Sequence, residues 1–281
     1  MSHTRPAITL CADDYGLAPG VSDAIRALIG MGRLQATGCM TGSAHWPEAA
    51  AALKPLDGLA DIGLHLTLTD QSPLGPMPAL APAGRLPPLP VLLKLALARR
   101  LDTAEIAVEL ERQIDAFEAA FGRPPDFLDG HHHVHQLPGI GEAVIGLWRR
   151  RLGGKGWFRS CVEPRAAIIA RGVSPLRALV ISELGQGFRR RLKSAGVPHN
   201  RSFRGVYDFS GRIPFDRLFE RFTDRPGPRT LMMVHPGHVD AALEAADTLT
   251  HQREVEYRFL ASDDMVRSLA RRGLTLARLS P

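Results

Sequence analysis

The sequence predicts an α/β fold with a mainly parallel sheet, and three observations support this prediction. Short apolar segments alternate with segments of helical periodicity along the 281 residues, 44% of the residues are hydrophobic, and neither an internal repeat nor a long linker divides the chain. Strands that alternate with helices form parallel sheets. At this length a single (βα) barrel, regular or irregular, fits best, with a doubly wound sheet as the alternative. We therefore expect one domain over residues 1–281.

Periodicity and turn residues place the individual elements. The clearest helix covers residues 103–121, where Thr103 can cap the start and Gly122 can end the helix. A loop insertion of about 69–102 contains many of the prolines, and within it residues of about 91–101 can form an amphipathic surface helix. Strands are expected at 7–12, 35–41, 62–69, 127–129, 157–162, 230–234 and 275–279. Further helices are expected at 20–31, 46–53, 139–151 and 262–272.

Composition and motifs argue against several classes of protein. The net charge of +6 comes mostly from arginines that are scattered along the sequence, and no regularly spaced aromatic residues accompany them. Charged residues on solvent-exposed surfaces therefore explain the positive charge better than a nucleic-acid binding site does. Three widely spaced cysteines argue against a disulfide scaffold and against a thiolate zinc site. The residues after the first strand, Ala12-Asp13-Asp14-Tyr15-Gly16, lack the glycine fingerprint of dinucleotide-binding folds.

The chain shows no sequence signal for export or membrane insertion. Residues 1–6 contain no apolar signal core, and the longest apolar-rich stretch, residues 86–98, is too short to span a bilayer. We therefore expect a cytoplasmic protein without a transmembrane segment. The amphipathic stretch leaves weak contact with a membrane surface open, and a homo-oligomer is also left open.

Side chains that can bind metal or transfer protons follow four of the predicted strands. Asp13 and Asp14 follow the first strand, His65 lies in the third, His131 follows the fourth, and His235 follows a late strand. In a barrel these ends converge on the rim where active sites form. Adjacent side chains of a regular strand point in opposite directions, so one aspartate can bind a metal while the other acts as a base. His65 and His235 can also be hydrogen-bonded core histidines, and His235 can be a ligand or a general acid.

The segment from Asp129 to His135 holds one carboxylate and four imidazoles. If the segment is extended, His131, His133 and His135 share one side and His132 faces away. Imidazole is the commonest nitrogen ligand for divalent metals, and His131 at the strand end is the best ligand candidate. His133 and His135 can orient ligands or contact substrate, while Asp129 can fix the tautomer of an imidazole.

Four of these segments, in their order and spacing, resemble the YdjC-like (ChbG/HpnK) carbohydrate deacetylase family over about residues 7–279. The first and third segments are specific, and the other two are weak alone. The segments are Ala12-Asp13-Asp14-Tyr15-Gly16-Leu17, Gly63-Leu64-His65-Leu66-Thr67-Leu68, Asp129-Gly130-His131-His132-His133-Val134-His135 and Val234-His235-Pro236-Gly237.

The resemblance implies a barrel related to polysaccharide deacetylases. It also implies an enzyme that removes the N-acetyl group from an N-acetylated amino sugar, in an oligosaccharide or a glycolipid. By the same resemblance, Asp14, His65 and His131 would hold one divalent metal ion, Asp13 would act as the base and His235 as the acid. The Arg-rich stretch of about 150–230, most of which is a variable region of about 165–228, matches the family poorly, so the sequence leaves the identity of the glycan open.

Several details stay open between alternatives. Imidazole ligands favour zinc and the resemblance favours magnesium, while manganese, cobalt and nickel are not excluded. We expect Arg159 to steady Asp13, with a surface or strand-capping role as the alternative. Trp46 can frame the sugar or have a plain packing role, and the sequence does not favour sugar contact over packing. The competing functions are another metal-dependent hydrolase, such as a two-metal phosphodiesterase, and a non-catalytic metal-binding protein.

Overall fold

A computed structural model describes residues 6–280 of the chain. Residues 1–5, which make up most of the segment in which we expect no signal core, and residue 281 lie outside the described residues. The strands are β1 (Ala7–Tyr15), β2 (Ala36–Cys39), β3 (Asp61–Leu66), β4 (Phe127–Gly130), β5 (Trp157–Phe158), β6 (Ser202–Arg204), β7 (Thr230–Val234) and β8 (Thr275–Leu276). The α-helices are α1 (Pro19–Gly30), α2 (Trp46–Leu53), α3 (Leu89–Leu97), α4 (Thr103–Phe121), α5 (Ile140–Arg151), α6 (Arg165–Arg171), α7 (Pro175–Ser194), α8 (Phe215–Phe222), α9 (Ala241–Ala246), α10 (His251–Ala261) and α11 (Asp263–Arg271).

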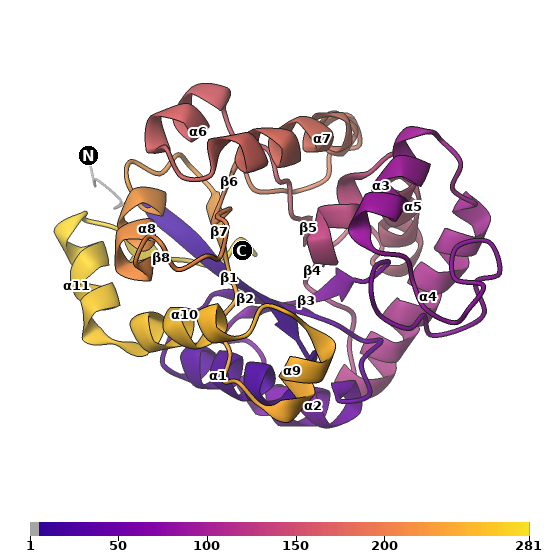
Figure 1. Cartoon of the computed structure of the whole chain (residues 1–281), viewed down its shortest axis with the longest axis horizontal. Helices are drawn as coiled ribbons and strands as arrows, with labels where there is room; N and C mark the ends of the chain where they lie inside the picture. The colour runs from indigo at the N-terminus through magenta and orange to yellow at the C-terminus, as the bar shows by residue number, and fades with distance from the viewer. Residues whose placement is uncertain (1–5, 281) are drawn as a thin grey trace.

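The strands form a parallel sheet around which the helices are arranged (Figure 1). The strand order is β5-β4-β3-β2-β1-β7-β6, with β8 paired to the start of β1. This confirms the expected α/β architecture. Within residues 6–280, however, the edge strands β5 and β6 share no ladder, and one isolated bridge between Phe158 and His199 links their sides. The expectation of a single barrel, regular or irregular, is therefore confirmed only in part, because the sheet forms a half-barrel and not a complete closed barrel.

A side chain takes the place of the missing ladder between the two edges. The amide of Asn200 accepts a hydrogen bond from the backbone N–H of Ser160 and donates to the carbonyl oxygens of Ser160 and Ser202. Because β5 has two residues and β6 has three, neither edge is long enough to supply these bonds from its backbone. Asn200 thus satisfies buried backbone groups that would otherwise lack partners.

The sheet is buried on both faces and separates two apolar clusters. Every residue of β2, β3, β4 and β7 is buried, as expected for parallel strands covered by helices. The larger cluster packs strand side chains such as Leu10 and Met232 against the helices. The smaller cluster contains their neighbours Cys11 and Leu231, which point to the opposite face because strand side chains alternate. Asp13, two residues beyond Cys11, continues this second face toward the carboxyl ends of the strands.

Several predicted boundaries agree with the structure, and one predicted cap does not. The bounds of α2, α4 and β7 are those predicted, whereas β2, β3 and β5 are shorter than expected. Thr103 is the first helical residue of α4 and not its cap. The carboxylate of Asp102 caps the helix by accepting from the N–H groups of Ala104 and Glu105. Gly122, with a φ of 97°, ends the helix as predicted.

The variable region of about 165–228, for which the sequence predicted no elements, contains the helices α6, α7 and α8 and the strand β6. In the loop insertion, the surface helix expected at about 91–101 is present as α3. It begins two residues earlier and ends four residues earlier than expected. Across residues 6–280, none of the helices has the length and apolar character needed to cross a bilayer.

Candidate active site

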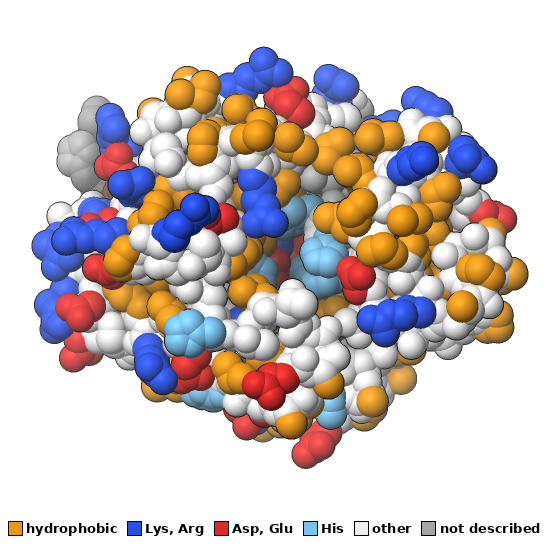
Figure 2. All heavy atoms as spheres, viewed as in Figure 1, with side chains coloured by type: hydrophobic (Ala, Val, Ile, Leu, Met, Phe, Trp, Pro, Cys, Tyr) orange, Lys and Arg blue, Asp and Glu red, His pale blue; other side chains and the backbone are white. Residues whose placement is uncertain are grey.

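A cavity of about 590 Å³ opens at the carboxyl ends of the strands. Figure 2 shows this hollow, with histidine side chains inside it and hydrophobic side chains around its mouth. Its lining includes the five residues from four strand ends that the sequence singled out, namely Asp13, Asp14, His65, His131 and His235. The structure therefore brings these side chains into one site.

A β-bulge at the end of β1 turns both aspartates into the cavity. The pairing of β1 with β2 shifts between Ala12 and Tyr15, so that Asp13 and Asp14 oppose a single residue of β2. Asp14 has a φ of 69°, in the left-handed region that aspartate adopts more readily than most residues. Adjacent side chains point apart in a regular strand, and that expectation is wrong here because the bulge re-aims one of them.

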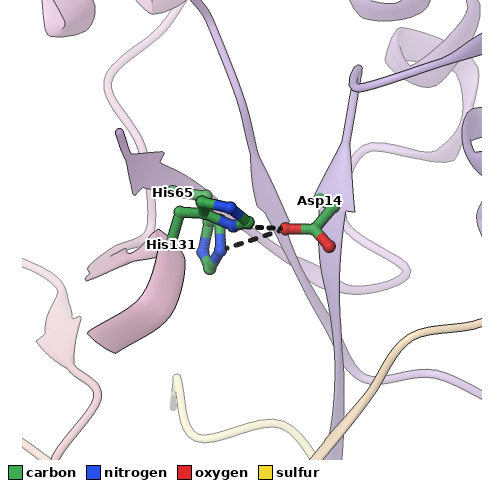
Figure 3. A group of neighbouring side chains, drawn as sticks. All are labelled: Asp14, His65 and His131. Atoms are coloured by element: carbon green, nitrogen blue, oxygen red, sulfur yellow. Dashed lines mark hydrogen bonds and ion pairs between the residues drawn. The ribbon is translucent and has the colours of Figure 1, made fainter. Parts of the chain in front are cut away.

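The first group of ligand-type side chains consists of Asp14, His65 and His131, and we call it the open cluster. Oδ1 of Asp14 lies 3.4 Å from Nε2 of His65 and 3.1 Å from Nδ1 of His131. The three ligand atoms all lie within 4.8 Å of one another. Figure 3 shows the two imidazoles facing the same carboxylate oxygen. One carboxylate and two imidazoles in this arrangement suit a divalent cation.

The second group consists of Cys11, Asp13 and Asp129, and we call it the closed cluster. Its ligand atoms also lie within 4.8 Å of one another. The fully buried guanidinium of Arg159 fills the space between them, donating to both carboxylate oxygens of Asp13. Nη2 of Arg159 also lies 2.7 Å from Oδ2 of Asp129 and 3.1 Å from Sγ of Cys11. A built-in cation thus already occupies this cluster.

The closed cluster sets the charge of the groups around it. Burial by itself would raise the pKa of Asp13, but the Arg159 guanidinium, with His65 and His235, brings that pKa well below its usual range. Burial would likewise lower the pKa of His65, but the charges of Asp129 and Asp13 raise it to about 10. Nδ1 of His65 donates to Oδ1 of Asp129 at 2.7 Å, which leaves Nε2 directed at the open cluster.

A second buried arginine, Arg253 of α10, holds the other oxygen of Asp14. Its Nη2 donates to Oδ2 of Asp14 at 2.6 Å and to Oδ2 of Asp247 at 2.7 Å. Burial would raise the pKa of Asp14, but Arg253 and His131 bring it well below its usual range. Nη1 of Arg253 is buried without a hydrogen-bond partner among the described residues, and the side chain lines the cavity. Each of the two aspartates is therefore paired with its own buried arginine.

His235 lies on the Asp13 side of the cavity, with Nε2 4.0 Å from Oδ2 of Asp13. Burial lowers the pKa of His235 to about 4 against the opposing effect of Asp14 and Asp13, so the imidazole is neutral at pH 7. The backbone N–H of His235 donates to Oε2 of Glu256 at 2.6 Å, and the Tyr207 hydroxyl donates to Oε1 at 2.5 Å. Burial raises the pKa of Glu256 to about 7.

Comparison with known proteins identifies the family. The sequence profile described as YdjC-like protein matches residues 7–271. The chain belongs to the YdjC-like family. It is 32% identical over 270 residues to a chitooligosaccharide deacetylase of Serratia marcescens, with 94% of each chain covered. It is 30% identical over 269 residues to a chitooligosaccharide deacetylase of Enterobacter sp. (strain 638), again with 94% of each chain covered.

This YdjC-like protein also shares its fold with a solved structure. The crystal structure of an Enterococcus faecalis protein, named for cellobiose-phosphate cleavage, matches with a TM-score of 0.75 and 20% identity over 98% of each chain. At that identity the likeness shows a common fold and no more.

The histidine-rich segment of this YdjC-like protein is not extended. His131–Gln136 form a short 3-10 turn, in which His132 and His133 have φ values of 53° and 60°. His132 and His133 both line the cavity, which corrects the expectation that His132 faces away. His135 is fully buried, and its Nε2 donates to the carbonyl oxygen of Arg159 at 3.0 Å. The expectation that His135 orients a ligand or contacts substrate is therefore wrong, because the turn directs it into the core.

Trp46 also lies away from the cavity. Its side chain is 2% exposed and stacks on Phe117 of α4 with ring centroids 5.5 Å apart. The indole N–H donates to the carbonyl oxygen of Ala116 at 2.9 Å. Trp46 joins α2 to α4, so of the two roles left open the structure corrects sugar contact and supports packing.

Sequence reasoning missed three residues that shape the site. Arg253 and Glu256 lie on α10, which carries no motif that points to β1. Gly38 of β2 faces the pair of His65 and Asp129, and a Cβ at this position would lie 2.9 Å from Nδ1 of His65. A glycine within an apolar strand is the one signal that could have indicated this close approach.

Proposed function

We propose that this protein is a metal-dependent hydrolase that removes the N-acetyl group from an N-acetylated amino sugar, in an oligosaccharide or a glycolipid. The observation that carries the proposal is the open cluster beside an ionised carboxylate, Asp13, in one cavity. Family membership supports it, as do two relatives named chitooligosaccharide deacetylase that align over 94% of their length. We include the whole chain, with its loop insertion around α3, in one deacetylase domain.

The donor set of the open cluster fits one divalent cation. Asp14, His65 and His131 would hold it, and Asp129 would keep the imidazole of His65 oriented through Nδ1. Once bound, the cation would polarise the amide carbonyl and make water more acidic. Zinc suits the two imidazoles, magnesium suits the carboxylate, and manganese, cobalt and nickel accept both ligand types.

The remaining groups of the site would move the protons. Asp13, which Arg159 holds ionised, takes a proton from the water that attacks the amide carbon. The carbon–nitrogen bond then breaks, and the departing nitrogen needs a proton. His235 is neutral beforehand, so the proton it delivers is the one that Asp13 removed from the water. Acetate and a free amino sugar are the products.

The alternatives receive less support from the site. A two-metal phosphodiesterase needs a second group of free ligands, and among the described residues the closed cluster is filled by Arg159. A protein that only binds metal does not require an ionised carboxylate beside the metal ligands. Here the buried Arg159 keeps Asp13 ionised next to the open cluster, as a catalytic base requires.

The test is acetate release from N-acetylglucosamine oligomers and N-acetylated glycolipids, with and without a chelator. We expect activity that is lost with chelator and restored by one added divalent ion per chain. Asp13→Asn should lower the rate by about 100- to 10,000-fold while the ion still binds, because it removes the base. Asp23→Asn, at an exposed carboxylate of α1, is the control and should keep full activity. Deacetylation that survives Asp13→Asn, or two tightly bound ions per chain, would contradict the proposal.

A further inference from the structure

Two helices present aliphatic stripes at the mouth of the cavity. In each stripe the residues are four positions apart, so they lie on one face of the helix. The stripe of α7 lines the cavity along its whole length, and the stripe of α3 lines it with its first two members. The residues are Leu89, Leu93 and Leu97 on α3, and Leu176, Val180 and Leu184 on α7.

The apolar surface of α3 continues beyond the cavity. Val91 is 46% exposed and Leu97 is 55% exposed, and neither lines the cavity. Only Leu92 and Ala96 of this nine-residue helix are buried. Figure 2 shows hydrophobic side chains spread around the hollow on this face of the molecule. A molecule held inside the cavity would leave Val91 and Leu97 in water, so whatever covers them is larger than the cavity.

Cations lie next to this apolar surface without partners. Lys94 is exposed on α3, and Arg99 and Arg100 are exposed directly after it. Within residues 6–280, none of the three forms an ion pair, although many other arginines of the chain do. Leucines beside unpaired lysine and arginine are the composition of helices that lie in the interface of anionic membranes.

We propose that α3 and the exposed end of the α7 stripe dock onto the surface of an anionic lipid bilayer, with the mouth of the cavity at the interface. The aliphatic side chains of α3 enter the headgroup region, and Lys94, Arg99 and Arg100 contact lipid phosphates. A second copy of the chain is a poorer occupant, because a symmetric contact across α3 would bring these three cations against their own copies. This docking surface does not depend on the proposed reaction.

Vesicle binding of the full chain tests the proposal. We expect the protein to sediment with vesicles of phosphatidylcholine mixed with phosphatidylglycerol, more weakly with phosphatidylcholine alone, and less as salt is added. The double variant Val91→Ser/Leu97→Ser should bind the mixed vesicles about thirtyfold more weakly, from the loss of two inserted aliphatic groups. The triple variant Lys94→Gln/Arg99→Gln/Arg100→Gln should bind them about a hundredfold more weakly at low salt.

A matched control variant replaces two exposed apolar residues that lie away from α3 and α7. Leu59, before β3 at the opposite end of the strands, is 57% exposed, and Val266 is 40% exposed on α11, across the molecule from α3 (Figure 1). Leu59→Ser/Val266→Ser should bind vesicles like the native protein. No vesicle binding by the native protein, equal binding by the α3 variants, or a Leu97-dependent dimer in ultracentrifugation would each overturn the proposal. Because the assay contains no substrate, failure of the proposed hydrolysis would not alter its result.

Discussion

The open and closed clusters both group ligand-type side chains near the ends of β1 and β4, but only the closed cluster contains a buried guanidinium between its ligand atoms. Each has three ligand atoms within 4.8 Å of one another, and both involve an aspartate of the β1 bulge. In the closed cluster a guanidinium takes the place that an ion could occupy. In the open cluster a different arginine, Arg253, contacts Oδ2 of Asp14, while Oδ1 of Asp14 faces the two imidazoles.

The difference shows that ligand type and spacing alone do not define a metal site. The position of the nearest buried cation decides whether a carboxylate is already neutralised by the protein. The Arg159 guanidinium keeps Asp13 ionised in the free protein, whereas Oδ2 of Asp14 contacts Arg253 and its Oδ1 faces the two imidazoles.

Removing the built-in cation should have the largest effect on stability. Arg159→Met leaves Asp13 and Asp129 buried without a partner, so the free energy of unfolding should fall by about 3–5 kcal/mol. Urea denaturation at pH 7 measures the loss. The control is Arg150→Met, which breaks a surface pair with Glu111 and should cost less than about 1 kcal/mol. Equal losses in the two variants would show that Arg159 is not the cation that stabilises the closed cluster.

Glu256 differs from Asp13 and Asp14, because its buried carboxyl group accepts hydrogen bonds but forms no ion pair among the described residues. Its pKa is raised from 4.5 to about 7, so folding favours the protonated form. The stabilisation is complete below pH 4.5 and is lost as the pH rises through 7. Relative to Glu256→Gln, the native protein should therefore lose up to about 3 kcal/mol over this range. Urea unfolding of both proteins at pH 5 and pH 8 checks this, and a difference that is constant with pH would refute it.

A ligand deletion in the open cluster should abolish stabilisation by metal. At a free Zn²⁺ or Mn²⁺ concentration one hundred times Kd, a bound ion adds about 2.7 kcal/mol to the free energy of unfolding. His131→Ala should remove this gain and its accompanying rise in Tm, since one of three ligands is lost. His251→Ala, at an exposed histidine of α10, should retain the gain. Equal stabilisation of the native protein and His131→Ala would place the ion elsewhere.

The smallest effect is expected at the thiol of the closed cluster. Cys11→Ser keeps a polar atom near Arg159 and should change the free energy of unfolding by less than about 1.5 kcal/mol. The number of bound ions, measured by elemental analysis after gel filtration, should stay the same as in the native protein. If one ion were lost on this substitution, the closed cluster would be a metal site after all.

The sequence predicted the residues at the strand ends of the site, because each apolar strand there is followed or interrupted by a polar residue. Asp13, His65, His131 and His235 each follow or interrupt such a strand, and parallel strands bring their carboxyl ends together. It could not predict Arg253, because 239 residues separate it from Asp14 and α10 has no pattern that records the contact. The turn at His132 and His133 was also missed, because positive φ values were not expected for two consecutive histidines.

The long helix α7 was missed for a different reason. The first part of its buried face contains Ala178, Ser182 and Gly185, which are small or polar, so only Phe188 and Leu192 near its end give the apolar periodicity that identifies a helix. Its strongest apolar stripe instead faces the cavity mouth, where Leu176 is 76% exposed.

The β-bulge at Asp13 and Asp14 has a consequence for engineering such a site. On a regular strand, two carboxylates on one face must be separated by a residue, so a search for alternating aspartates would pass over this pair. Grafting the adjacent pair onto another parallel strand would require the extra residue and a left-handed conformation at the second aspartate as well. Conversely, deleting one residue between Ala12 and Tyr15 would restore regular pairing and leave a single carboxylate to serve as either ligand or base.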